Sequence, residues 1–495
     1  MSTNAQNPTA STPPSASLAR QAPFEGVAPG LLLLAVAVIA AAVTAALTTA
    51  MLWNTTLALI LVAAGVMVTA VSRYTPVLMV LCCAAIAVPL SLTGEYSKMA
   101  LSTTDALSIV LLIPLVSTWF KRRRLNLGPA GWPLALYFTV CTLATLTGTS
   151  ITWGGLGQVV SLGRSLLATL VPVAIFGNLG RREGRWALPH LCFLSYLLGM
   201  PVMTGVMLWL FKQEGFQSSM YAFGMNKNGL GPALGCGVAI SLSYLLGRLP
   251  LARTRSGTAM LLAALVLSGL GLVLSLSRGA WIATAAACLL IVLCTRNVKA
   301  FLLSFLILVP LLAGIWNMLP EQAVSYATNV SPDSSSIQER FNAMSVVMSA
   351  FRSNPLCGVG VGLRKDFEPH DVLILTLGET GIIGLAAFCL MFAGGFYTFI
   401  KARRYCQGPG ERQLLVVGAA LLLLSITHGL MDVYWRRGIG VFGWASVGIA
   451  VAIMNRPRTP AQAPVVANED DQEILDEQEP ADEFAPASSL EGRLQ

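Results

Sequence analysis

Two side chains in this sequence are best suited to chemistry, and both interrupt long apolar runs. The chain is 55% hydrophobic and only 11% charged. An ionisable group beside an apolar run is energetically costly unless it is paired, so such a group is a candidate for a functional role. Arg278 lies in SLSRGAW, where a guanidinium can bind phosphate oxygens bidentately or simply anchor a helix hairpin at the membrane surface. His370 lies in PHDVLILTL, where a neutral imidazole can accept a proton from a hydroxyl group or serve only as a surface or helix-cap residue.

Three further polar residues accompany this pair. Asp371 either orients the imidazole or caps the helix that VLILTL predicts. Glu379 follows His370 by nine positions, which would place the two on opposite faces of a continuous helix; a carboxylate at a membrane boundary still needs a partner. Arg340 lies in SSSIQERFNAMSVVMSAF, whose apolar spacing predicts an amphipathic helix with its arginine facing solvent or a cavity.

Other motifs have plainer interpretations. GVGVG at 358–362 follows no predicted strand, so it is interpreted as a turn that permits close backbone approach rather than as a nucleotide loop. His428 and Asp432 are one helical turn apart, and structural anchoring is the favoured interpretation of that pair. Arg164, inside a predicted span, is a secondary candidate. The ten cysteines show no disulfide framework and no metal-ligand spacing, so neither a metal site nor a cofactor is expected.

The elements that must position these residues are membrane helices. Apolar runs long enough to cross ~30 Å of hydrocarbon fall at about 29–49, 51–71, 75–93, 103–120, 132–148, 159–178, 187–211, 228–247, 257–277, 279–295, 300–318, 380–400, 413–433 and 438–455. The expected fold is all-α: a polytopic membrane protein of about 14 helices (range 12–14), with short helices in one longer outer loop. The run over 257–295 is too long for one span and must break at SLSRGAW.

The distribution of charge predicts the orientation. With the amino terminus in the cytoplasm, cytoplasmic loops collect about twice as many Lys and Arg residues as the opposite loops, as the positive-inside rule requires. Both termini are then cytoplasmic, and the long loop at about 319–370 faces outward. A basic membrane body suits anionic lipids or anionic lipid-linked substrates, or merely reflects topogenic charge. No nucleic-acid partner is expected.

The sequence divides into three predicted parts. Residues 1–28 are polar and rich in Pro, Ser and Thr, which predicts a disordered cytoplasmic tail. Residues 29–458 form the predicted membrane domain. Residues 459–495 contain ten of the 24 acidic residues and predict a disordered acidic cytoplasmic tail.

Three stretches in this order resemble the bacterial O-antigen ligase and polysaccharide polymerase family. They are SLSRGAW (275–281), QERFNAMSVVMSAFRSNPLCGVGVG (338–362) and PHDVLILTLGETGIIGL (369–385). FGMNKNGLG (223–231) is also similar to an Asn-containing stretch of that family. The resemblance covers roughly residues 220–400.

The resemblance implies a metal-independent, GT-C-like glycosyltransferase in the bacterial inner membrane. Such an enzyme transfers a polyprenyl-diphosphate-linked glycan to an acceptor sugar hydroxyl on the periplasmic face. It implies that Arg278 binds the diphosphate and that His370 is the essential base. Asn228, Lys227, Arg340, Asp371 and Glu379 are the further residues expected to contact substrate. A second arginine that members often carry before the Asn-containing stretch is not matched, and Lys212 and Lys227 are the nearest cations; the family's His-Asn pair is His-Asp here.

Several functions remain open at this point. Polymerisation of exopolysaccharide or O-antigen repeat units is favoured, because the outer loop is modest in size and the acceptor is then lipid-linked like the donor. Ligation to a lipid A core uses the same chemistry, and attachment to protein hydroxyls is a third possibility. From another class, a lipid-linked oligosaccharide flippase or secondary transporter also fits many spans, although such proteins often show two similar halves. Membrane lipids, chain-length regulators and export proteins are the further partners considered.

Overall fold

The computed structural model of the chain is an assembly of helices. It describes residues 75–88, 103–148, 155–179, 187–214, 221–222, 225–247, 250–297, 321–328, 335–363, 369–432 and 439–455, with scattered residues between 299 and 320. Two of the predicted spans, at 29–49 and 51–71, and both predicted tails lie outside the described residues. The span predicted at 300–318 is only partly described.

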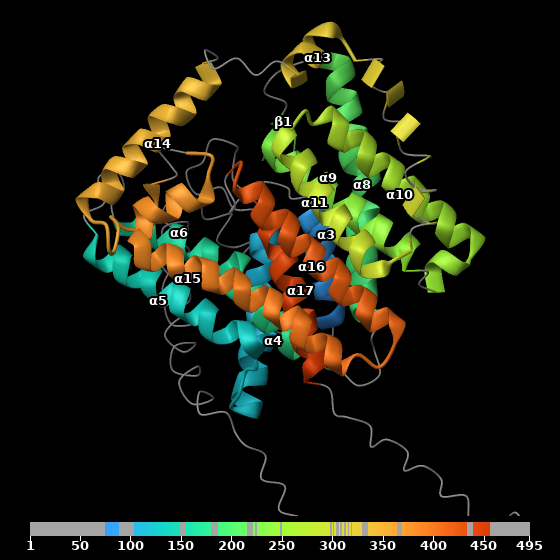
Figure 1. The fold of residues 1–495 in the computed structure, drawn as a ribbon. Coiled ribbons are helices and arrows are strands. Elements are labelled where there is room, and N and C mark those ends of the chain that lie inside the picture. Colours follow the sequence, from blue (N-terminus) through green and yellow to red (C-terminus); the bar gives the residue numbers. More distant parts are fainter. Residues whose placement is uncertain are drawn as a thin grey trace, which may run out of the picture. The chain divides into compact units, whose positions relative to one another are not determined.

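Figure 1 shows the described helices in their order along the chain. The α-helices are α3 (Thr75–Ala87), α4 (Thr103–Arg122), α5 (Gly131–Thr147), α6 (Gly155–Ala168), α7 (Leu170–Leu179), α8 (Ala187–Glu214), α9 (Lys227–Leu246), α10 (Arg255–Leu274), α11 (Arg278–Thr295), α13 (Glu321–Thr328), α14 (Ser335–Ser353), α15 (Val372–Ala402), α16 (Pro409–Gly429) and α17 (Ile439–Met454). Short 3-10 turns are η2 (Gly128–Ala130), η3 (Pro250–Arg253) and η5 (Arg403–Tyr405).

The one exception to helix in the described part of the chain is a small antiparallel hairpin. Strands β1 (Tyr221–Ala222) and β2 (Met225–Asn226) pair just before α9. The all-α expectation therefore holds except for this hairpin, which lies inside the FGMNKNGLG stretch.

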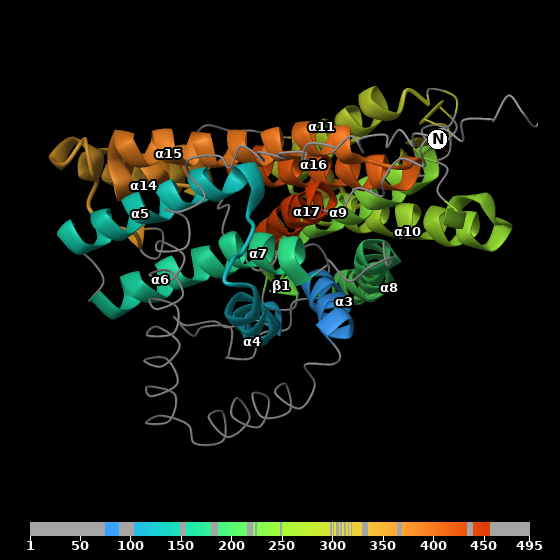
Figure 2. The ribbon, with the colours of Figure 1, turned by 90° about the horizontal axis from the view of Figure 1, so that it is seen from below.

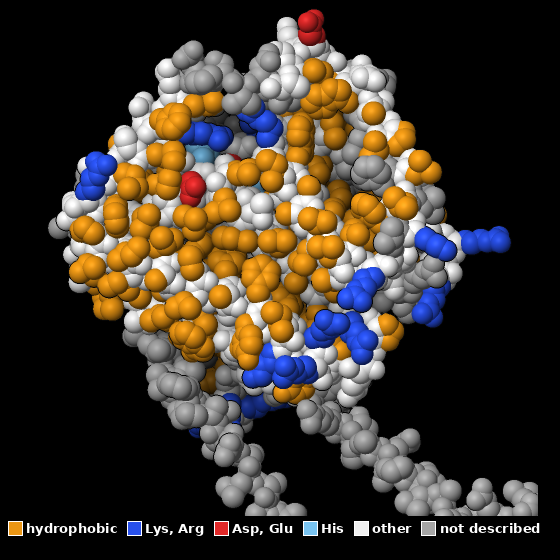
Figure 3. Space-filling model, viewed as in Figure 1, with side chains coloured by type: hydrophobic (Ala, Val, Ile, Leu, Met, Phe, Trp, Pro, Cys, Tyr) orange, Lys and Arg blue, Asp and Glu red, His pale blue; other side chains and the backbone are white. Residues whose placement is uncertain are grey.

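Nine helical segments of the described chain are long and apolar enough to cross a membrane, and Thr75–Ala87 and Gly440–Met454 are shorter apolar helices. Each predicted span that falls on fully described residues corresponds to one of these segments. Large apolar side chains on them are exposed to the surroundings, among them Leu146 (77%), Leu198 (68%) and Ile400 (66%). A protein in water rarely exposes such surface so extensively. Figure 3 shows this apolar surface across one face, with Lys and Arg side chains along its lower and right margins.

The centre of the bundle is formed by α9 and α17. The span of α9 is 94% buried, and it packs against α8, α10, α11 and α16, whereas α17 packs against α7, α15 and α16. Figure 2 shows α9 and α17 between α16 on one side and α3 and α8 on the other. Small residues permit the close approach: an added Cβ at Gly231 of α9 would lie 2.7 Å from Cβ of Ala280 in α11.

The helices alternate in direction, so that particular helix ends meet. The starts of α9, α11 and α15 and the end of α16 are joined by side-chain contacts described below, and we call this the site end. At the opposite end, the Asn126 side chain donates to Asn455 Oδ1 (2.6 Å), and the backbone N–H of Asn126 donates to Asn178 Oδ1 (3.0 Å). These contacts tie the start of the α5 region to the ends of α7 and α17.

Helix α15 is broken near the site end. Gly381 has φ +66° inside it, a left-handed conformation that favours glycine. Backbone N–H groups of Ile382 and Ile383 donate to the carbonyls of Pro355 and Leu356, so the preceding loop inserts into the break. The predicted span at 380–400 is thus only the second part of α15, which begins eight residues earlier.

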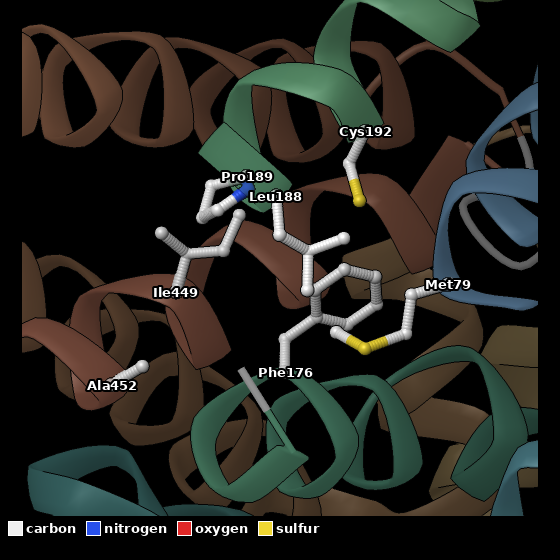
Figure 4. A pocket seen from close by; sticks show the side chains of 7 residues that line it. All are labelled: Met79, Phe176, Leu188, Pro189, Cys192, Ile449 and Ala452. Atoms are coloured by element: carbon white, nitrogen blue, oxygen red, sulfur yellow. The ribbon is translucent and has the colours of Figure 1, made fainter. Parts of the chain in front are cut away.

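The described chain contains an apolar pocket among α3, α7, α8 and α17, far along these helices from the site end. It is lined by Met79, Phe176, Leu188, Pro189, Cys192, Ile449 and Ala452 (Figure 4). No charged side chain lines this pocket, so it offers no group for acid-base chemistry or anion binding.

We expect Gly381→Ala to destabilise the protein. An L-residue forced into left-handed backbone costs about 1–2 kcal/mol, and the new Cβ would also collide with the Leu356 carbonyl. Thermal unfolding of the detergent-purified protein should show a lower midpoint. Gly205→Ala is the matched control, since a Cβ there meets nothing within 4 Å; equal midpoints for the two variants would contradict the assigned break.

Candidate functional site

The break between α10 and α11 presents Arg278 at the site end. Helix α10 ends at Leu274 and α11 begins at Arg278, which confirms the break predicted at SLSRGAW. Between them Leu276 has φ +50°, and the Ser275 hydroxyl donates to the Leu272 carbonyl (2.7 Å) while accepting from the Ser277 N–H (3.3 Å). These bonds replace helix hydrogen bonds across the turn and fix the direction in which α11 starts.

The start of α9 is fastened to the same turn. Asn226 caps α9 by accepting from the Gly229 N–H (3.1 Å), and the Ser277 hydroxyl lies 3.3 Å from Asn228 Oδ1. Asn228 is therefore next to the residue that precedes Arg278. The structure thus joins two of the sequence motifs that lie about fifty residues apart.

His370 stands immediately before α15 in a rarely used backbone conformation. Its φ is +55°, which costs a non-glycine residue of order 1–3 kcal/mol and is most often found at functional sites. Its Nδ1 lies 3.1 Å from Asp432 Oδ1, and the two side chains are 23% and 3% exposed. A carboxylate at Nδ1 favours the tautomer with hydrogen on Nδ1, which leaves Nε2 as the basic nitrogen.

Three cations gather next to this pair. Arg340 and Arg278 repel the positive charge of Lys227, and Asp432 attracts it. We call Lys227, Arg278 and Arg340 the cation cluster. All three side chains are partly buried. Nη1 of Arg278 is buried and has no hydrogen-bond partner among the described residues, so this guanidinium still has a donor to offer.

Helix ends add to the positive potential. Helices α9, α11 and α15 begin at Lys227, Arg278 and Val372, so three amino-terminal ends, each with a partial positive charge, lie at the site end. Figure 3 shows a hollow beside α14 in which basic, histidine and acidic side chains meet. Together these features provide the positive charge and the hydrogen-bond donors that an anion site requires, with an imidazole beside them.

The other predicted residues have mainly local contacts. Asp371 Oδ1 accepts from the N–H groups of Leu373 (2.7 Å) and Ile374 (3.1 Å), so it caps α15 and the ring partner of His370 is Asp432 instead. Lys212 and Lys227 are the candidate replacements for the second arginine of the family. Lys227 belongs to the cation cluster, whereas no described interaction joins Lys212 to it. Arg164 is half-buried in α6, and no described interaction joins it to that cluster.

Glu379 holds the glycine loop. Its Oε1 accepts from the Gly362 N–H (2.7 Å), and its backbone carbonyl accepts from the Gly360 N–H (2.9 Å). Gly358, Gly360 and Gly362 all have positive φ, which confirms that GVGVG is a turn of close backbone approach. His370 lies before α15 with φ +55°, so it is not part of the helix that carries Glu379 and the prediction of opposite faces of one helix does not apply.

Asp432 is the candidate site residue that the sequence interpretation missed. Its four-residue spacing from His428 favoured an anchoring pair within one helix, and the two are joined by a backbone bond from the Asp432 N–H to the His428 carbonyl (3.0 Å). The side chain instead reaches His370, 62 positions away. A buried acid at the outer end of a span was the available signal, but only the fold shows which helix it faces.

The described residues contain no group of three or more His, Cys, Asp or Glu side chains arranged to hold a metal ion.

Part of the chain matches a protein-family model. Residues 263–389, about a quarter of the chain, match the family model described as O-antigen ligase. The chain carries a domain of the O-antigen ligase family. No curated protein matches the chain. Within residues 263–389 the chain is thus of O-antigen ligase type, and its long apolar helices are those of a membrane protein.

The O-antigen ligase segment contains Arg278, Arg340 and His370 but not Lys227 or Asp432. Those two residues come from α9 and from the turn after α16, on either side of the matched segment. The site is consequently completed by helices that the family match does not cover.

Replacing Asp371 tests its role as the helix cap of α15. Asp371→Ala should lower stability by about 1 kcal/mol because α15 loses its side-chain cap, whereas Asp371→Asn should keep most of it. Thermal unfolding in detergent measures both. A loss of stability in the Asn variant equal to that in the Ala variant would show that the capping bonds are not what Asp371 contributes.

Proposed function

We propose that this protein transfers a polyprenyl-diphosphate-linked glycan to an acceptor sugar hydroxyl at the periplasmic face of the bacterial inner membrane. The observation that carries the proposal is the cation cluster, with its open Arg278 donor, beside the His370–Asp432 pair. A diphosphate leaving group and a hydroxyl nucleophile need this combination of several fixed cations and one base.

In the proposed reaction, the acceptor hydroxyl oxygen attacks the anomeric carbon of the donor sugar. Its proton passes to Nε2 of His370 while the bond from that carbon to the diphosphate oxygen breaks. The electron pair leaves with the polyprenyl diphosphate, and attack opposite the leaving group inverts the anomeric carbon. Asp432 stabilises the imidazolium that forms, because its carboxylate accepts from Nδ1.

The cation cluster supplies the stabilisation of the leaving group. Negative charge on the diphosphate grows as the glycosidic bond breaks, so fixed cations favour the transition state over the ground state. Arg278 provides bidentate binding, and Lys227 and Arg340 take the place of the family's second arginine. We propose that no metal is required, that Asn228 contacts substrate beside Ser277, and that Asp371 and Glu379 act by holding His370 and the glycine loop near the substrate.

The acceptor decides between the closest alternatives. We favour polymerisation of exopolysaccharide or O-antigen repeat units, because the segment between α11 and α15 leaves little room for an outer domain and the acceptor is then membrane-bound like the donor. Ligation to lipid A core uses the same site, and the acceptor that gains glycan distinguishes the two. A flippase or secondary transporter would carry donor across the membrane with no new glycosidic bond. Chain-length regulators or export proteins are proposed partners of a polymerase.

Substitutions in the site should separate binding from chemistry. We expect His370→Ala to lower transfer by about 10²–10⁴-fold through loss of the base. Arg278→Ala should lower it by about 10²–10³-fold, with Arg278→Lys intermediate because it keeps charge without the bidentate grip. Release of polyprenyl diphosphate with elongated glycan, from purified protein and a lipid-linked repeat unit, is the measurement. Undiminished transfer in His370→Ala, or loss of transfer with a metal chelator, would contradict the mechanism.

One further variant and one matched pair of variants refine that test. Asp432→Asn should lower kcat by about 10–100-fold with KM for the donor little changed, since a charge-assisted bond to the base is lost. Arg340→Ala should raise KM for the donor, whereas Arg352→Ala on the exposed end of the same helix should not. Equal effects of the two arginine variants would remove Arg340 from the site.

Native cysteines can test the proposed orientation. Cys357, beside the glycine loop, and Cys294, in the last turn of α11 and so away from the site end, are both exposed. In spheroplasts expressing variants that keep only one of them, an impermeant maleimide should label Cys357, and should label Cys294 only after permeabilisation. The reverse pattern would place the site end in the cytoplasm.

A further inference from the structure

Helix α11 has a continuous exposed apolar face that ends at Arg278. Ile282, Leu289 and Leu293 are 50%, 60% and 64% exposed, and Ala285 is exposed between them. At ~100° per residue, these positions and Arg278 fall within about 80° around the helix axis. They therefore form one stripe, which we call the α11 stripe, with a cation at its site end and only apolar side chains below it.

The two sides of the stripe are held by different contacts. Gly279 lies against Met431 after α16, and Ala280 lies against Gly231 of α9, so these two positions face the protein. On the other side, the indole N–H of Trp281 donates to the Leu272 carbonyl (2.8 Å), and its ring meets Trp316 edge-on at 6.0 Å. The stripe is thus a fixed surface beside a rigid aromatic pair.

The chemistry of the stripe follows from the ligand proposed for Arg278. A polyprenyl diphosphate has its anion at one end of a long, branched, apolar chain. When the diphosphate binds the cation cluster, the chain must continue toward the hydrocarbon. From Arg278 the stripe extends over ~22 Å of helix at 1.5 Å per residue, in that direction. On α8 the exposed apolar residues run instead toward Lys212, which no described interaction joins to the cation cluster.

We propose that the α11 stripe is the docking surface for the polyprenyl tail of the donor, with Trp281 and Trp316 bordering the isoprene units next to the diphosphate. This inference rests on the proposed function for the identity of the ligand. The tail reaches the site laterally from the bilayer along α11, and it does so because the buried, unpartnered Nη1 of Arg278 fixes the diphosphate at the end of the stripe.

Photo-crosslinking tests the surface directly. A benzophenone amino acid is placed at Ile282 or Leu289, and, as the matched control, at Leu198 of α8, which is exposed to a similar degree (68%). Purified full-length protein is irradiated with a radiolabelled long-chain polyprenyl diphosphate. Adducts should form at Ile282 and Leu289 well above Leu198. Unlabelled polyprenyl diphosphate should suppress them, and the matching polyprenol should not.

Combining this label with a change at the cation cluster tests the link between the two. Arg278→Ala should lower labelling at Leu289 by about tenfold or more at subsaturating ligand, because a charge-assisted contact to the diphosphate is lost. Equal labelling at Leu198, or labelling that does not depend on the diphosphate, would overturn the inference and show ordinary lipid contact.

Transfer activity of the same preparations keeps this outcome separate from that of the proposed function. Glycan transfer without selective labelling of the α11 stripe would disprove the docking surface and leave the enzyme activity standing. Selective, diphosphate-dependent labelling without transfer would support the docking surface and count against the proposed reaction.

Discussion

The repulsion of Lys227 by Arg278 and Arg340 is the interaction on which the candidate site depends. Like charges held close together in a partly buried place raise the energy of the unliganded protein, and a buried guanidinium nitrogen without a hydrogen-bond partner adds a desolvation cost. An anion with more than one negative charge removes both penalties at once. The proposed diphosphate ligand would therefore gain more from this cluster than a single carboxylate, which could neutralise only one of the three cations.

The bundle can tolerate this arrangement because two of the three cations, Lys227 and Arg278, sit at helix ends rather than within the apolar core. Helix α9 is almost fully buried along its length, yet its first residue is Lys227, and α11 likewise begins with Arg278. Each charge is thus placed where a chain leaves the hydrocarbon region and where the helix end already has a partial positive charge. The buried body of α9 fixes the position of Lys227, and the Asn228–Ser277 contact brings the two starts together.

Local sequence patterns predicted the helices and the break at SLSRGAW, because apolar run length and a single interrupting charge are sufficient to set both. They also predicted Arg278 and His370 as the residues to consider. They could not predict that Asp432 pairs with His370, since the contact joins the start of α15 to the turn after α16 and depends on how α15 and α16 pack. The break at Gly381 was likewise hidden: the glycines of GETGIIG fit close packing as well as a kink, and only the insertion of the 355–356 carbonyls distinguishes them.

The left-handed backbone of His370 has to be stabilised by contacts from the surrounding structure. A left-handed residue in front of a helix is unfavourable on its own, and here it is followed at once by the capping bonds of Asp371 and opposed by the carboxylate of Asp432. The cap fixes where α15 begins, so it fixes the backbone that precedes it. The carboxylate then selects one rotamer and one tautomer of the ring. Contacts from two separate elements thus offset the strain and hold the imidazole in place. In the proposed reaction the base would therefore need little further ordering.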